Sequence, residues 1–516
     1  MRPHLLAVVC LLIGAPAFAA QNAQADGTRR MAERLKQITA RTNPELNPFM
    51  SSRRAQLLGS MVTSQGAKAP PALLREYAQE LLYAGRTAEA IARYDQLRKM
   101  MQASGLDPRS PPWVDLMMRQ AVANLRRGED ENCVFHHNAR SCMFPIRGSG
   151  VHKEQRGSRE ASRILGQLLA QEPGNLGARW LLNIAFMTLG EYPGGLPRGQ
   201  LLAPELFESE YAIKPFPDIA SELSVAVDDL AGGSILEDFD GDGSLDIMAS
   251  AMGFESQLRY FHNEADGTFS DRTAAAGLTG EVGGLNIVQT DYNNDGHADV
   301  FVLRGGWMGP GGHFPDSLLR NNGDGTFTDV TEPSHLLSLH PDQTGAWLDF
   351  DSDGWLDLFV GNESAEGETH PCELFRNNGD GTFSECAGEA GVATAAYVKG
   401  VTSGDFNNDG RPDLYLSVHG GPNHLFRNDG ATGGAKKPGS CGWRFTDVTA
   451  AAGVTEPHHS FPRGSGITTT TVGRTCSCPG SSWESWATSR PTIWASRTGR
   501  SCRASTATTG TGPSAM

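Results

Sequence analysis

Four nine-residue segments in the second half of the chain share the pattern D-x-[DN]-x-D-G-x-x-D. Side-chain oxygens at positions 1, 3, 5 and 9 and the backbone carbonyl of position 7 can converge on one calcium ion, and the glycine at position 6 permits the sharp turn. Asparagine at position 3 lowers the charge of the second and fourth loops, which predicts weaker binding there. The predicted ligands are Asp238, Asp240, Asp242, Ser244 and Asp246; Asp291, Asn293, Asp295, His297 and Asp299; Asp349, Asp351, Asp353, Trp355 and Asp357; and Asp405, Asn407, Asp409, Arg411 and Asp413.

The residues after each loop follow the pattern of a strand. An EF-hand would need a bidentate glutamate at position 12, and this chain has Ala249, Val302, Val360 and Leu416 there. The alternating apolar stretches after the loops predict strands, so the EF-hand is rejected. A solvated acidic turn explains one such loop, but four copies with the same internal spacing argue against it.

The loops belong to a longer repeat. Each is followed by an apolar-Arg/His-Asn turn and an aromatic strand, as in Phe375-Arg-Asn-Asn-Gly-Asp-Gly-Thr-Phe383, where Asn-Gly and Asp-Gly supply the positive φ angles of a hairpin. The first aspartates are separated by 53 (Asp238 to Asp291), 58 (to Asp349) and 56 (to Asp405) residues. A repeat of this length with two turns and four short strands predicts one blade of a β-propeller.

These repeats resemble FG-GAP/VCBS repeats, the calcium-loop blades also found in integrin α-chains. The Leu-Phe-Arg-Asn-Asn-Gly-Asp-Gly-Thr-Phe and Asp-Val-Thr signatures are most similar to the cartilage-acidic-protein-like (ASPIC/UnbV-associated) exported proteins. The resemblance covers about 225–460. It implies calcium-stabilised blades that bind ligands or mediate adhesion, and it implies no catalysis.

The first half of the chain, 26–193, has a helical pattern. Leu74–Gly85 and Ala88–Leu97 place apolar and small residues at three- and four-residue spacing on both sides of a glycine. This resembles one tetratricopeptide helix pair, with Gly85 at the turn and Ala90 as the small contact residue. Partial copies run through Trp113–Gly128 and Ala161–Gly190, although generic helical hairpins explain the pattern as well. The predicted fold class is therefore α + β and multidomain, a tetratricopeptide-like helical region followed by a partial β-propeller of about four calcium-loop blades.

The N-terminus predicts export. An apolar run from Leu5 to Ile13 follows Arg2, and Ala17-Phe18-Ala19 offers a cleavage site, so 1–19 is interpreted as a signal peptide. A lipoprotein anchor at Cys10 is the alternative. The net charge of −15 argues against binding to nucleic acid or anionic membranes. No later apolar run is long enough to span a bilayer, and the predicted location is periplasmic or extracellular.

Export permits disulfides. Cys133 and Cys142 are spaced for a local disulfide, with zinc binding by these residues and His136 and His137 as the alternative. Cys372 and Cys386 flank a turn centred on Gly379, which predicts a disulfide across that hairpin.

The tail, 463–516, loses apolar periodicity. A low-complexity linker is the ordinary interpretation. A one-base shift of the reading frame, however, lets Arg463–Cys478 encode W-F-W-D-Y-D-N-D-G-W-P-D-L-F-V and lets Ala504–Ser514 encode L-Y-R-N-D-G-D-G-T-F. We therefore interpret the tail as frameshifted and disordered, with no function for Cys476, Cys478 and Cys502, and we expect the last blade to keep an exposed edge.

The predicted function is that of an exported, calcium-binding interaction or adhesion protein without catalytic activity. Its expected partner is an extracellular or periplasmic protein or glycan. One alternative is a carbohydrate-active enzyme that uses the propeller face, for which His340, His370, His419 and His424 are the candidate residues. A structural component of a surface assembly is another.

Overall fold

The computed structural model describes residues 14–134, 136–138, 140–208, 211, 216–433 and 441–460, with side chains from residue 26 onward. Of the predicted signal peptide, 1–13 lie outside the described residues, and 14–19 are described only as helical backbone. The predicted out-of-frame tail, 463–516, lies wholly outside them. Both assignments stay predictions.

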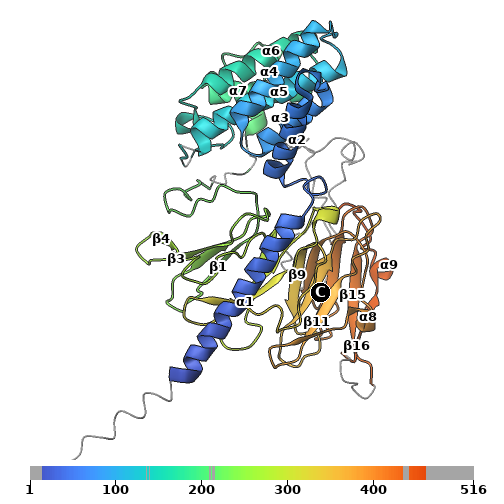
Figure 1. Cartoon of the computed structure of the whole chain (residues 1–516). Coiled ribbons are helices and arrows are strands. Elements are labelled where there is room, and N and C mark those ends of the chain that lie inside the picture. Colours follow the sequence, from blue (N-terminus) through green and yellow to red (C-terminus); the bar gives the residue numbers. More distant parts are fainter. Residues whose placement is uncertain are drawn as a thin grey trace, which may run out of the picture. The chain divides into compact units, whose positions relative to one another are not determined.

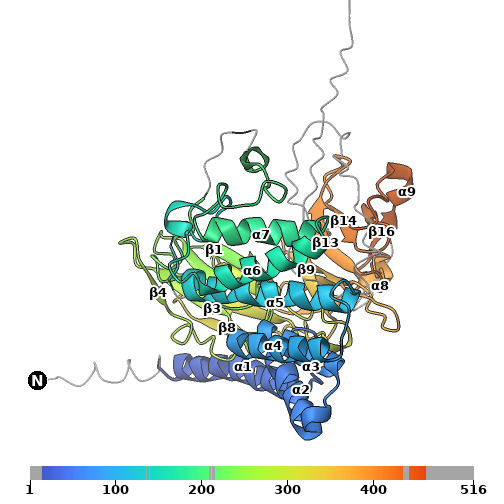
Figure 2. The ribbon, with the colours of Figure 1, turned by 90° about the horizontal axis from the view of Figure 1, so that it is seen from above.

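The N-terminal part of the chain is helical (Figures 1 and 2). The helices α2 to α7 pack in chain order, each against the next. Prolines at the first turns of α3 and α5 and the Asn175 side chain, which accepts a hydrogen bond from the backbone of Ala178 at the start of α7, mark where helices begin. The helix bounds are α1 (Gly14–Arg41), α2 (Ser51–Gln65), α3 (Pro71–Tyr83), α4 (Thr87–Ala103), α5 (Pro111–Glu129), α6 (Arg156–Gln171) and α7 (Leu176–Thr188).

Four antiparallel sheets of four strands follow, and in each sheet neighbouring strands are consecutive in the chain. The first sheet holds β1 (Ser234–Glu237), β2 (Asp246–Ala249), β3 (Arg259–Asn263) and β4 (Phe269–Asp271), and the second β5 (Asn286–Thr290), β6 (Asp299–Leu303), β7 (Ser317–Asn321) and β8 (Phe327–Asp329). The third holds β9 (Asp342–Leu348), β10 (Asp357–Asn362), β11 (Glu373–Asn377) and β12 (Phe383–Glu385), and the fourth β13 (Val398–Gly404), β14 (Asp413–Val418), β15 (His424–Ala431) and β16 (Trp443–Asp447). Short helices α8 (Ala387–Ala390) and α9 (Thr449–Ala452) follow the last strands of the third and fourth sheets. The predicted order, a helical region and then repeated four-stranded units, is confirmed.

The second sheet packs between the first and the third. Strand β6 is buried along its whole length, because successive side chains of a strand point to opposite faces and both faces are covered. Val300 and Val302 pack in a cluster with the first sheet, whereas Phe301 and Leu303 pack in a cluster with the third. The first strands β1, β5, β9 and β13 also contact one another in that order. The second and third sheets therefore bury their second strands, β6 and β10, between two neighbouring sheets, and neighbouring sheets meet along their first strands.

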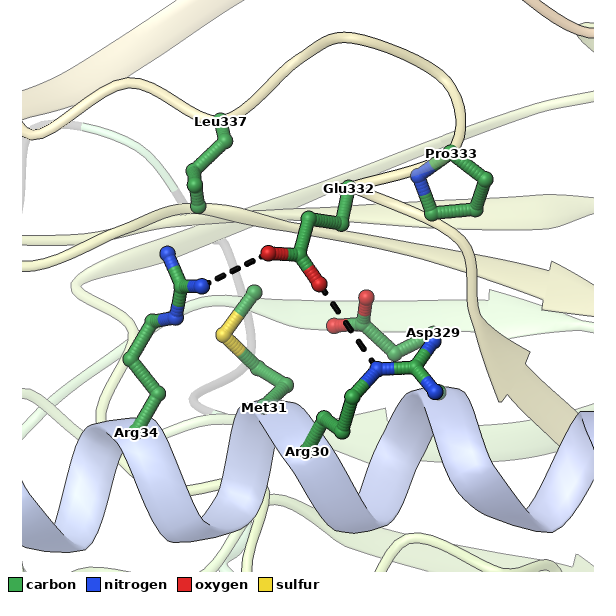
Figure 3. A pocket seen from close by; sticks show the side chains of 8 residues that line it. Arg30, Met31, Arg34, Asp329, Glu332, Pro333 and Leu337 are labelled. Atoms are coloured by element: carbon green, nitrogen blue, oxygen red, sulfur yellow. Dashed lines mark hydrogen bonds and ion pairs between the residues drawn. The ribbon is translucent and has the colours of Figure 1, made fainter.

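Helix α1 packs against the sheets. Its side chains Met31 and Leu35 are buried in a cluster with Phe254 and Phe314, and the helix contacts β8. Figure 3 shows the charged edge of this contact, where Arg34 donates to Glu332 at 2.7 Å and Arg30 lies 3.6 Å from the same carboxylate. The sequence pattern places 26–41 in the helical region and gives no sign of this packing.

The second sheet and its connections bury a group of charged and polar side chains. Arg304 and Glu281 form an ion pair at 3.1 Å with neither side chain exposed, and Ser317 donates to the same carboxylate. Burial, and then the nearby Asp329 carboxylate, raises the pKa of Glu281 to about 8. Glu281 therefore binds a proton more tightly in the folded protein than in the unfolded chain.

We expect this proton to make stability fall with rising pH. Because the folded pKa of Glu281 exceeds the unfolded one, its contribution is complete below the ordinary glutamate pKa and is lost as the pH rises through about 8. Between about pH 6 and pH 8 the loss amounts to about 2 kcal/mol. Urea denaturation at both pH values should show this slope in the wild-type protein and a smaller slope in Glu281→Gln, which is neutral at every pH. Equal slopes for the two proteins would contradict the assignment.

The predicted Cys372–Cys386 disulfide is wrong in this structure. Both thiols are free and buried, and the register pairs Phe375 with Glu385, which sets Cys386 opposite Leu374. The two cysteines are therefore two residues out of register across the hairpin. Cys386 is hydrogen-bonded instead to Cys441, a contact that together with burial raises the pKa of the Cys386 thiol. The turn alone predicted the hairpin, but it did not determine which residues face each other.

Candidate metal-binding loops and the sheets that position them

Each aspartate loop connects the first and second strands of its sheet. The carboxylate of the first aspartate accepts a hydrogen bond from the backbone of the glycine at position 6, as Asp238 does from Gly243 at 2.9 Å and Asp349 from Gly354 at 3.1 Å. That glycine has φ between 84° and 90° in all four loops, a conformation that side chains with a Cβ rarely adopt. The loop is thus folded around its first carboxylate, and the predicted role of the glycine is confirmed.

The last aspartate of each loop anchors the loop to the sheet. In the third loop, one oxygen of Asp357 accepts from the backbone of Phe350 at 3.0 Å and the other from the backbone of Asn377 at 2.8 Å. Asp246, Asp299 and Asp413 make the equivalent pairs of bonds. Burial raises the pKa of Asp299 and of Asp357 to about 8. In its ionised form, which metal binding requires, a carboxylate has about four acceptor positions, so these two bonds would still leave capacity for a metal ion.

The middle positions bring the remaining oxygens together. Carboxylate oxygens of Asp349, Asp351 and Asp353 lie within 4.8 Å of one another, and so do donor atoms of Asp240, Asp242 and His262. In the second and fourth loops the asparagine at position 3 donates to the aspartate at position 5, with distances of 2.8 and 2.9 Å. At position 7, the backbone amides of Ser244, His297, Trp355 and Arg411 donate to the aspartate at position 5.

Basic side chains contact three of the loops. Arg376, on β11, donates to Asp351 at 2.6 Å and to Asp353 at 2.8 Å. His262, on β3, lies 3.3 Å from Asp240 and 3.2 Å from Asp246, and Arg411 pairs with Asp409 within its own loop. His262 and Arg376 were not among the predicted site residues, although both occupy the repeated Arg/His position before the asparagine of the turn. A metal ion bound in the first, third or fourth loop would therefore compete with a side-chain cation for the same carboxylates.

That repeated asparagine links each sheet to the one before it. Asn377, on β11, donates to the carbonyl of Leu356 in its own loop at 3.1 Å and to the carbonyl of Tyr292 in the preceding loop at 2.9 Å. Asn321 and Asn428 make the same pair of bonds, to Ala298 and Phe239 and to Pro412 and Phe350. The aromatic residue at position 2 packs on the next sheet, as Phe239 does on Phe327. The loops are thus part of the contact between sheets.

Two of the four histidines considered for catalysis come together. His340 and His370 have their Nδ1 atoms 2.8 Å apart, and Glu368 lies 3.5 Å from His370. His424 pairs with Asp447 at 3.1 Å on the fourth sheet. His419 packs with Trp307, Tyr397 and His459.

Among the residues that the structure describes, Cys133, His136, His137 and Cys142 do not form a cluster that could hold a metal ion. Cys133 and Cys142 are free thiols joined by a hydrogen bond, which raises the pKa of Cys133. His136 and His137 turn their Nδ1 atoms toward the backbone carbonyls of Glu131 and Cys133. The predicted local disulfide between Cys133 and Cys142 is therefore absent from this structure.

Comparison with protein families identifies the class of repeat. The segments 238–302 and 349–416 match the family model for the FG-GAP-like repeat. Together these two segments include all four aspartate loops. In these two segments the chain is therefore similar to the FG-GAP-like repeat.

Among curated proteins, the chain is similar to cartilage acidic protein 1. It is 26% identical to the protein of Homo sapiens over 421 residues, which cover 74% of this chain and 59% of that protein. It is 29% identical to the Mus musculus protein over 232 residues (42% of this chain, 33% of the relative) and 29% identical to the Xenopus tropicalis protein over 175 residues (31% and 24%). The chain thus spans at most about three-fifths of the length of these relatives, and the predicted resemblance is confirmed.

None of the helices within the described residues combines the length and the apolar character needed to cross a membrane.

Proposed function

We propose that this chain is an exported calcium-binding interaction protein whose four sheets are propeller blades, each holding one calcium ion in its aspartate loop. The observation that carries the proposal is the gathering of Asp349, Asp351 and Asp353, whose carboxylate oxygens lie within 4.8 Å of one another at the end of a rigid hairpin. Calcium prefers such hard oxygen ligands. In each loop the side chains at positions 1, 3, 5 and 9 and the backbone carbonyl of position 7 would hold the ion.

The calcium ions would act on the assembly of the sheets. The carboxylate at position 9 accepts a hydrogen bond from the third strand of its own sheet, and in the first three loops the carbonyl at position 2 accepts one from the next sheet. Neutralising the loop carboxylates would therefore favour the packed arrangement. The contact of β1, β5, β9 and β13 in order supports a radial arrangement of blades. The blade faces and loops are then available for a protein or glycan outside the cytoplasm.

The helical region is proposed as a second surface for a partner. Gly85 has a φ of 72° at the turn between α3 and α4, and Ala90 is fully buried where these helices meet. Both features support a tetratricopeptide-like pair, which presents an extended surface when stacked. The matched repeat family supports a binding role for the chain.

Calcium titration of the purified full-length chain tests the proposal. We expect one ion per loop, with tighter binding in the first and third loops, which carry four aspartates each, than in the second and fourth. Asp349→Ala should remove one tight site by isothermal titration calorimetry. The matched control is Asp380→Ala, which removes an aspartate from the exposed Asp-Gly turn of the same sheet and should leave the stoichiometry unchanged. A wild-type chain that takes up no calcium would overturn the proposal.

A further inference from the structure

A second group of possible ligands lies away from the aspartate loops. His313 follows a short helical turn (Gly309–Gly311) and precedes β7 of the second sheet. Glu368 and His370 lie in the connection between β10 and β11 of the third sheet, and His340 precedes β9. The group is therefore assembled from three separate connections, and the packing of the second sheet on the third brings them together.

The donor atoms of three of these residues point at one another. Glu368 Oε2 lies 3.6 Å from His313 Nε2 and 3.5 Å from His370 Nε2, and one donor atom of each residue lies within 4.8 Å of the others. Ligands about 2.0–2.1 Å from a tetrahedral ion are separated by about 3.3–3.4 Å, so the spacing matches a small divalent cation.

The outer neighbour of His313 sets its tautomer, and the tautomer of His370 depends on which histidine of the His340–His370 pair donates. His313 Nδ1 lies 3.2 Å from the carbonyl oxygen of Leu339, which can only accept, so Nδ1 carries the hydrogen and Nε2 carries the lone pair. The Nδ1 atoms of His370 and His340 share one hydrogen at 2.8 Å. When His370 donates it, its Nε2 also faces Glu368 with a lone pair. A ligating histidine is usually held in this way by a partner of its second nitrogen.

His370 is the buried member of the group. It is only 6% exposed, and its Nε2 atom makes no hydrogen bond. A buried polar atom without a hydrogen bond is costly, and in this position it faces a carboxylate and a second lone pair. When both Nε2 atoms carry lone pairs, they and the Glu368 carboxylate are three converging electron-pair donors, which a bound cation would satisfy.

From this geometry we infer that His313, Glu368 and His370 form a binding site for a divalent transition-metal ion, with zinc as the expected occupant. Two imidazole nitrogens and one carboxylate oxygen form a ligand set that suits zinc and leaves a fourth position for water or another ligand. Calcium, which takes six to eight oxygen ligands, does not match this set. The site is distinct from the aspartate loops in its residues, in its position and in its chemistry.

The surroundings support a preformed site with access to solvent. Ser364 holds the connection that carries Glu368 and His370, because its hydroxyl accepts from the backbone of His370 and donates to the carbonyl of the same residue, both at 2.8 Å. A hollow of about 230 Å³, lined by residues that include Arg41, Asn43 and His313, opens beside the group. Zinc can thus reach His313 and Glu368, whose side chains are 43% and 29% exposed.

Zinc binding by the full-length chain tests the inference. The protein is stripped of metal, saturated with calcium and titrated with zinc chloride against a chromophoric chelator. We expect His313→Ala and Glu368→Gln each to weaken one zinc site by about tenfold or more. Both residues are partly exposed, so these variants should fold, and thermal melting in calcium checks this. His458→Ala is the matched control, because His458 pairs with Glu456 at the surface and lies outside the group.

The number of zinc ions bound by the wild type minus the number bound by a variant reports on this site alone. Zinc bound elsewhere in the chain, for example by cysteines, cancels in this difference. Extended X-ray absorption fine structure of the wild-type zinc complex should show imidazole nitrogen ligands at about 2.0 Å from the zinc ion. This signal should weaken in His313→Ala. Zinc uptake that is equal in the wild type and in the His313→Ala/Glu368→Gln double variant would overturn the inference, because a proton shared with Glu368 would then explain the geometry. Calcium uptake is measured separately, so this result is independent of the proposed function.

Discussion

Removal of calcium with a chelator is expected to lower the melting temperature of the protein substantially. An ion that binds only the folded state stabilises it by about 2.7 kcal/mol per site at a hundredfold excess over Kd. Four loops therefore contribute several times that amount. The physical reason is the gathering of three or four carboxylates in each loop, whose mutual repulsion the metal ion removes. Thermal melting in calcium and in chelator measures the effect, and an unchanged wild-type melting temperature would show that the loops are only acidic turns.

The loops should contribute unequally to this calcium response. Asp240→Ala and Asp351→Ala, in the loops with four aspartates, should remove more of it than Asn293→Ala and Asn407→Ala. Asp351 also binds Arg376, so its loss costs an ion pair with or without calcium. The quantity to compare is therefore the shift between calcium and chelator for each variant. A larger loss of response in the asparagine variants would contradict the ranking by charge.

The second large effect is expected from Asn377→Ala. Asn377 is 1% exposed, and its side chain donates to the carbonyls of Tyr292 and Leu356 and accepts from the backbone of Gly379 at 3.0 Å. A buried polar group that loses its partner costs about 1–3 kcal/mol. Because the substitution removes the donor from two carbonyls, one of them in the neighbouring sheet, we expect a loss of about 3 kcal/mol in the free energy of unfolding.

The neighbouring residue provides the control. Asn378 is exposed, and its amide bonds only within its own turn, to Thr382 and Ser384. Asn378→Ala should therefore cost well under half of the Asn377→Ala effect in urea denaturation. Equal losses for the two variants would mean that the link between the sheets carries no special stability. Asn321→Ala and Asn428→Ala remove the equivalent bonds and should behave like Asn377→Ala.

Turns, strands and the helix pair were predictable because interactions between residues close together in the sequence determine their backbone conformation. The glycine at position 6 adopts a positive φ in every loop, and apolar stretches such as Asp299–Leu303 form the expected strands. The turn around Gly85 between two helices was predictable for the same reason. In each case a few consecutive residues determine the backbone conformation by themselves.

Register and the contacts between segments were not predictable in this way. The hairpin between β11 and β12 was expected, but its register sets Cys386 opposite Leu374 and leaves its thiol beside Cys441. The hydrogen bonds of Asn377 across the sheets reach a residue 85 positions earlier. The repeated Arg/His-Asn pair was visible in the sequence, but its function depends on which loop lies beside it.

The sequence by itself determined the repeat, its aspartate loops and the strands that follow them. Only the tertiary structure decided that Arg376 and His262 contact the loop carboxylates, that α1 packs on the sheets, and that His313, Glu368 and His370 meet. The reason is physical. A loop or a strand follows from the preferences of adjacent residues, whereas these contacts exist only once the sheets have stacked, and the order of stacking depends on the burial of strands such as β6 from both sides.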